Sequence, residues 1–125
     1  MLQTVVIASG GAIGAVLRFW VSSATYAMLG RAFPYGTLVV NVIGSFAIGL
    51  LSILLVEKFD VPHEIRLGLV VGVLGALTTF STFSWDTLDL IEQGLLERAL
   101  LNVLLNVVVC IAAAYAGTQW ARSMV

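Results

Sequence analysis

The sequence predicts an all-α membrane protein with four transmembrane helices, and three observations support that prediction. Of its 125 residues, 60% are hydrophobic and only 10% are charged, whereas soluble domains contain about 25% charged residues. The charges lie in clusters, and long apolar stretches separate these clusters. Each stretch provides the roughly 20 apolar residues that a helix needs to cross the hydrocarbon core. We therefore predict a single four-helix transmembrane domain over residues 1–125, surrounded by lipid.

Charge-free stretches and turn residues define the four helices in order. The stretches without any charged residue are Ala32–Val56, Leu67–Trp85 and Ala99–Ala121. The segment before them is equally apolar but contains Arg18, and Gly30 and Pro34 mark the turn after it. The expected helices are residues 4–29, 35–56, 66–94 with a break near 75–79, and 98–122.

Composition and charge also exclude several classes of function. The net charge is −1, so no basic surface is available for nucleic acid, and we expect no nucleic-acid partner. A single cysteine, Cys110, cannot form a disulfide framework within the chain. The sequence contains no nucleophile–base pair, metal-ligating cluster or phosphate-binding loop, so we expect that it is not an enzyme.

The basic residues give almost no preference for one orientation in the membrane. Lys58, Arg66 and Arg122 are expected on one side, and Arg31 and Arg98 on the other. Short loops rich in Lys and Arg stay cytoplasmic, but these two sides are nearly balanced. The chain therefore either inserts in both orientations, so that two copies can pair antiparallel, or takes one orientation set by the small excess.

The third apolar stretch is expected to be a broken helix. It carries Gly68, Gly72 and Gly75 and then the hydroxyl-rich run Thr78–Ser84. Glycines weaken a helix, and hydroxyl groups can bond their own backbone in place of the helical ladder. We predict an interruption between Gly75 and Thr79. Freed carbonyls and N–H groups in lipid need a partner, which is either an ion or a set of hydroxyl groups that cap a simple kink.

Polar side chains recur every fourth residue on the second and fourth helices. The two stripes are Thr37, Asn41, Ser45 and Gly49, and Asn102, Asn106 and Cys110. Such stripes either line a polar path or bond helices together, and both interpretations stay open for Asn41. Arg18 follows Gly10 and Gly14 on one face of the first helix, where it either supports the structure or contacts a ligand.

Two phenylalanines, Phe80 and Phe83, share one face of the third helix. Such rings usually face lipid or core, but their positively polarised edges can also attract a small anion when hydrogen-bond donors lie nearby. All seven acidic residues fall in segments expected to be loops or helix ends. A proton-coupled transporter normally needs an ionisable group at mid-membrane, so this placement favours passive flow.

Three segments resemble the CrcB/Fluc fluoride channel family. They are Gly10–Arg18 (GGAIGAVLR), Gly36–Phe46 (GTLVVNVIGSF) and Gly72–Ser84 (GVLGALTTFSTFS), which occur in the expected order. The helix-four residues match less well, because the family commonly has Tyr, Ser or Thr where this chain has Asn102, Asn106 and Cys110. A small multidrug-type transporter would need a carboxylate in its first helix, and no acidic residue precedes Glu57. A non-transporting membrane protein would not need Asn41 together with an interrupted helix.

The resemblance implies an antiparallel, dual-topology homodimer, multi-pass in the bacterial inner membrane, that exports fluoride passively through two pores. It implies that the residues lining each pore are Asn41, Phe80, Phe83, Ser81 and Thr82. It further implies a structural sodium ion, not transported, held by backbone carbonyls of Gly75 and Thr78 from both subunits. Arg18 matches an arginine of the family with a structural role.

Overall fold

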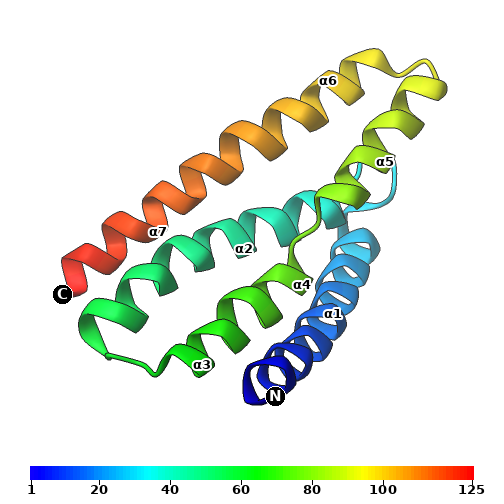
Figure 1. Ribbon diagram of the computed structural model, residues 1–125. Helices are drawn as coiled ribbons and strands as arrows, with labels where there is room; N and C mark the ends of the chain where they lie inside the picture. Colours follow the sequence, from blue (N-terminus) through cyan, green and yellow to red (C-terminus); the bar gives the residue numbers. More distant parts are fainter.

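The computed structural model describes all 125 residues, and its secondary structure is entirely helical (Figure 1). Four helical spans are long and apolar enough to cross a membrane: Leu2–Leu29, Tyr35–Lys58, His63–Glu92 and Leu96–Met124. The predicted all-helical fold and the number of helices long enough to span a membrane are thus confirmed. The ends differ from the expected ones by a few residues, because the local cap and loop geometry sets a helix end and hydropathy does not resolve it.

Shorter elements make up each span. The first span is α1 (Leu2–Leu29), and the second comprises α2 (Tyr35–Ile53) and η1 (Leu54–Lys58). The third comprises α3 (His63–Leu67), η2 (Gly68–Leu74), α4 (Gly75–Leu77) and α5 (Phe80–Glu92). The fourth comprises α6 (Leu96–Leu104), η3 (Leu105–Val109) and α7 (Cys110–Met124). The η segments are wider turns with i→i+5 hydrogen bonds, which occur frequently at functional sites.

The third span is interrupted at two consecutive threonines. Thr78 (φ −82°, ψ 157°) and Thr79 (φ −154°, ψ 116°) both have extended backbones. Helix α5 restarts directly afterwards because the Thr79 hydroxyl accepts the N–H of Thr82 at 3.1 Å and so caps the new helix. This interruption lies inside the Gly75–Thr79 stretch where the sequence predicts it, and Figure 1 shows it as the coil between α4 and α5.

Helix α2 lies in the middle of the subunit, with α7 along one side and α1 along another (Figure 1). Helix α1 also crosses the third span at η2 and α4. At this crossing Gly10 and Gly14 are buried, and a Cβ atom on either would collide with a backbone carbonyl of the third span. The glycine face of the first helix is therefore a close-packing surface.

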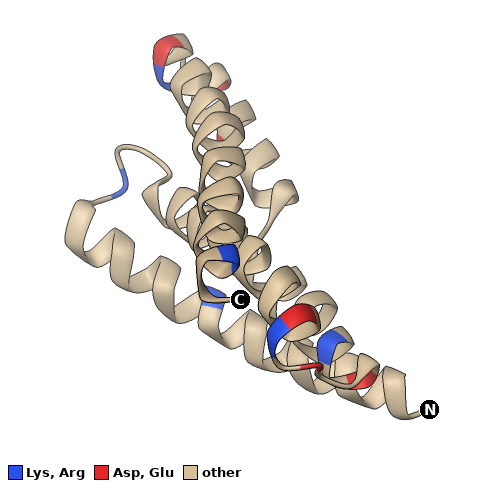
Figure 2. Ribbon diagram, turned by 90° about the vertical axis from the view of Figure 1, so that its left-hand side faces the viewer, with Lys and Arg blue, Asp and Glu red and all other residues tan.

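The charged connections meet at the two ends of the bundle, as the sequence predicts. The Lys58 ammonium donates to the carbonyl of Met124 at 2.8 Å at one end. The Arg98 guanidinium donates to the carbonyl of Ala32 at 3.0 Å at the other. Figure 2 shows long uncharged stretches of helix between the coloured charge clusters. The first and third connections thus lie at one end of the bundle, and the second connection lies at the other end beside the C-terminus.

A single subunit leaves most of its apolar surface uncovered. Only 23 of 125 residues are buried, and large side chains such as Phe19, Phe80 and Trp85 are mostly exposed. So much exposed apolar surface is stable only against lipid or against another protein surface.

Candidate functional site

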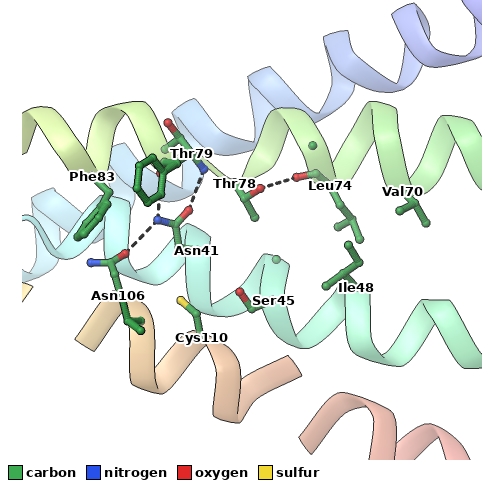
Figure 3. Close-up of a pocket in the computed structure, with 14 residues that line it drawn as sticks. Asn41, Ser45, Ile48, Val70, Leu74, Thr78, Thr79, Phe83, Asn106 and Cys110 are labelled. Atoms are coloured by element: carbon green, nitrogen blue, oxygen red, sulfur yellow. Dashed lines mark hydrogen bonds between the residues drawn. The ribbon is translucent and has the colours of Figure 1, made fainter. Parts of the chain in front are cut away.

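A groove of about 360 Å³ opens beside the interruption, between the second, third and fourth spans (Figure 3). It brings together residues from both polar stripes and from both sides of the break. The lining residues are Asn41, Gly44, Ser45, Ile48, Val70, Leu74, Gly75, Thr78, Thr79, Phe80, Phe83, Asn106, Val107 and Cys110. None of these side chains is charged, so any electrostatic attraction for an ion must come from dipoles.

Asn41 supplies the hydrogen bonds that the broken helix has lost. Its carbonyl oxygen Oδ1 accepts the backbone N–H of Thr79 at 2.8 Å. Its amide Nδ2 donates to the Thr79 carbonyl at 3.1 Å and to the Asn106 carbonyl oxygen at 3.0 Å (Figure 3). Because lipid offers no substitute partner for a freed backbone group, this amide stabilises the interruption. Asn41 therefore bonds two other spans and also lines the groove, while its role in an ion path stays a prediction.

A chain of hydrogen bonds continues from Asn41 along the fourth span. Asn106 Nδ2 donates to both the backbone carbonyl and the side-chain oxygen of Asn102, each at 3.0 Å. Asn102 Nδ2 donates to the Thr87 hydroxyl at 3.0 Å, and that hydroxyl donates to the Phe83 carbonyl at 2.8 Å. Asn102 is fully buried, at 0% exposure. The helix-four asparagines thus form a continuous amide ladder that joins the second, fourth and third spans.

Phe80 and Phe83, the two phenylalanines expected to line the pore, lie together at the groove. Their ring centroids are 5.3 Å apart with an interplanar angle of 58°. Phe83 is buried at 8% exposure, whereas Phe80 is 76% exposed and lies at the open side of the groove. Such a tilted pair can present positively polarised ring edges toward the cavity.

The interruption also changes the hydrogen bonding of nearby carbonyl groups. The N–H of Thr79 donates to Asn41. It therefore does not make the helical hydrogen bond to the carbonyl of Gly75, four residues earlier. Among the turn, loop and cap hydrogen bonds, none has the Gly75 or Thr78 carbonyl as its acceptor. Both residues line the groove. Carbonyl oxygens of this kind are hard ligands that suit hard cations, and no group of His, Cys, Asp and Glu side chains offers an alternative metal site.

A second polar cavity, of about 380 Å³, lies on the other side of Thr79. It is lined by Arg18, Arg31, Thr82 and several other hydroxyl-bearing residues, and Thr79 lines both cavities. Ser81 lines neither of them, and its hydroxyl lies 3.3 Å from that of Thr79. The predicted pore residues therefore do not all face one cavity, because successive positions on a helix point about 100° apart.

Arg18 reaches the second cavity from the glycine face of α1 and is half-buried. Its guanidinium makes no hydrogen bond within the subunit to a loop or helix-end carbonyl, so its structural role stays a prediction.

One acidic residue joins the third span to the second. Asp86 lies in α5, in the segment expected to be the end of the third helix, and is half-buried. Its carboxylate accepts the hydroxyl of the buried Thr37 at 2.7 Å. The third span continues as a helix to Glu92, close to the predicted end at residue 94. Asp86 lies toward the end of that span and is absent from both cavities.

Two residues central to the site, Thr79 and Thr87, could not be singled out from the sequence. Thr79 is one of several hydroxyl residues in its run, and only its contacts with Asn41 and Thr82 distinguish it. Thr87 accepts a hydrogen bond from Asn102 across the α5–α6 turn, and no spacing within its own helix signals that contact. By contrast, the four-residue separation of Asn102 and Asn106 did indicate a polar stripe.

Comparison with known proteins agrees with this geometry. Residues 5–118 match the family model described as CrcB-like protein, Camphor Resistance (CrcB). Proteins named fluoride-specific ion channel FluC are 53% identical in Methylococcus capsulatus, 53% in Magnetococcus marinus and 47% in Geobacter metallireducens. These matches cover 98%, 93% and 99% of the chain. The chain spans 54% of the Methylococcus protein, 94% of the Magnetococcus protein and 100% of the Geobacter protein. By the family model and by these relatives, the chain belongs to the CrcB-like family.

Proposed function

We propose that this protein is a fluoride channel that lets fluoride leave the cytoplasm passively across the bacterial inner membrane. The observation that carries the proposal is the groove at the interrupted helix, where an amide donor and two aromatic rings meet without any charged side chain. The relatives named fluoride-specific ion channel FluC support it, because their similarity covers nearly the whole chain.

The chemistry of fluoride explains why weak donors suit the groove. Moving an unpaired small anion into hydrocarbon costs on the order of tens of kcal/mol, so its water must be replaced by other donors. A conducting path must nevertheless bind the ion weakly enough to release it. The Asn41 amide and the edges of Phe80 and Phe83 provide partial positive charge without a fixed cation that would trap the ion. A narrow path would exclude the larger chloride ion.

A second, antiparallel copy of the chain would complete the pathway. The groove is open on one side, and Phe80 is exposed in a single subunit. Two copies related by a twofold axis would cover each other's grooves and form two equivalent pores. The nearly balanced basic residues at the two ends support insertion in both orientations.

The carbonyls of Gly75 and Thr78 would hold one sodium ion where the two interrupted helices meet. Their availability at the break fits a hard cation, for which carbonyl oxygens are suitable ligands. When bound, the ion supplies positive charge near the pores and joins the two subunits. It is a structural ion in this proposal, and it does not move with fluoride.

Fluoride efflux from proteoliposomes tests the proposed activity. Vesicles loaded with potassium fluoride and given valinomycin should release fluoride rapidly, as measured with a fluoride electrode. Chloride-loaded vesicles should release almost nothing, and collapsing the proton gradient with a protonophore should not slow the fluoride efflux. Fluoride release no faster than from empty vesicles contradicts the channel, and dependence on a proton gradient contradicts passive flow.

Size-exclusion chromatography in detergent tests the dimer and the sodium ion together. The protein should elute as a dimer in sodium chloride and shift toward the monomer when N-methyl-D-glucamine replaces sodium. A monomer in sodium contradicts the dimer, while a dimer of unchanged thermal stability without sodium contradicts the ion.

Thiol labelling tests the antiparallel arrangement. A thiol introduced by Ser123→Cys in a Cys110→Ala background should react equally from both faces of the membrane. Labelling from one face alone contradicts the antiparallel arrangement.

A further inference from the structure

The proposed function gives no role to the amide ladder beyond Asn41, which consists of Asn106, Asn102 and Thr87. We propose that the side-chain oxygen of Asn106 is a tethered competitor of the anion for the Asn41 amide, and that Asn102 and Thr87 are positioning residues that aim it. This inference rests on the proposed function, since it concerns how weakly the same groove holds its anion.

The first step concerns the two hydrogens of the Asn41 amide. One is donated to the Thr79 carbonyl, and the other is donated to Asn106 Oδ1. None of the turn, loop and cap hydrogen bonds between backbone groups ends on the Thr79 carbonyl, so withdrawing the first hydrogen would leave that carbonyl without a partner. The second hydrogen is donated to a side chain, so withdrawing it leaves no backbone group without a partner. An anion at Asn41 therefore takes the hydrogen that Asn106 holds (Figure 3).

The second step concerns the orientation of Asn106. An amide has a donating end and an accepting end, and here the donating end points away from Asn41. Both hydrogen bonds donated by Asn106 Nδ2 end on Asn102. Asn102 in turn donates to the Thr87 hydroxyl, which donates to the Phe83 carbonyl. Every donor in the ladder thus points from Asn41 toward Thr87, and this direction places the Asn106 oxygen at the groove.

The third step is the consequence of removing the far end of the ladder. Asn102 is 0% exposed, so water cannot replace the Thr87 hydroxyl as acceptor of its N–H. Without that hydroxyl, the buried N–H is best satisfied if Asn102 and Asn106 reverse their amides. The reversed Asn106 would direct its N–H toward the N–H of Asn41, and an anion between them would accept both in place of a water molecule. The Thr87 hydroxyl therefore keeps anion binding weak, which conduction requires.

Concentration-dependent efflux from proteoliposomes tests this inference. Thr87→Val and Asn106→Leu should each lower the half-saturating fluoride concentration by about 2- to 10-fold, the range expected for one neutral hydrogen bond. Their maximal flux should fall as well, because a more tightly held ion leaves more slowly. Thr87→Ser should restore both values. The matched control is Thr25→Val, since the Thr25 hydroxyl also donates four residues back but lies outside the ladder.

The possible outcomes separate this inference from the channel itself. If the unaltered protein conducts and both variants keep or raise the half-saturating concentration, the competitor role is overturned and the channel stands. If the unaltered protein releases no fluoride, the proposed function fails first. Size-exclusion chromatography identifies variants that do not assemble. If either variant fails to assemble, Asn106→Ser is measured in its place. The shorter serine side chain also withdraws the acceptor from the Asn41 amide, so the half-saturating fluoride concentration should fall in the same way.

Discussion

Replacing Asn41 with aspartate is expected to reduce fluoride flux by roughly a thousandfold. The carboxylate can still accept the N–H of Thr79, so the interruption keeps one of its two hydrogen bonds to this position. It can no longer donate to the Thr79 carbonyl or to Asn106, and it adds a negative charge at the groove. Two like charges about 4 Å apart repel by about 4 kcal/mol near a protein surface, and this energy corresponds to roughly a thousandfold change.

Fluoride efflux measured beside size-exclusion chromatography checks this result. The control is Gln119→Glu, which makes the same amide-to-carboxylate change at an exposed position of α7 outside both cavities. That control should conduct normally, and both variants should remain dimers. An Asn41→Asp dimer that conducts as well as the unaltered protein would remove Asn41 from the ion path.

The fold was largely predictable because hydropathy and local backbone chemistry determine it. Apolar stretches of membrane-spanning length required four helices, and the run from Gly75 to Thr79 weakened the third one where it is in fact interrupted. Those signals are local in sequence. They act on each helix separately and do not depend on which helices pack beside it.

The detailed site was less predictable because it depends on pairs of residues from different spans. Asn41 and Thr79 are 38 positions apart, and only the packing of α2 against the interruption makes them partners. The family resemblance groups Thr82 with Asn41, whereas α5 turns Thr82 toward the second cavity. Asp86 lies in the expected helix-end segment, but its hydrogen bond with Thr37, 49 positions away, could not be predicted from charge.

In the proposed channel, the pairing of Asn41 with Thr79 links the interruption to the anion path. A broken helix in lipid needs a partner for its freed backbone groups, and Asn41 meets that need with the same amide that faces the groove. The anion path and the structural support of the break therefore cannot be altered independently at this position. The phenylalanines differ in this respect, since neither ring supports the freed backbone of Thr79.

Phe80→Ile should consequently separate conduction from folding. The Phe80 ring is 76% exposed in a single subunit, so losing it removes little packing within the subunit. Isoleucine keeps an apolar side chain but lacks the polarised ring edge, an effect worth about 0.5–1.5 kcal/mol for aromatic contacts. Flux should fall up to about tenfold, with the dimer and its thermal stability unchanged. Phe19→Ile is the control, because Phe19 is a similarly exposed ring, at 68%, on α1 and away from the groove. Equal flux in the two variants would mean that the Phe80 ring edge contributes nothing to the passage of fluoride, and that the Asn41 amide alone replaces the water that the ion gives up.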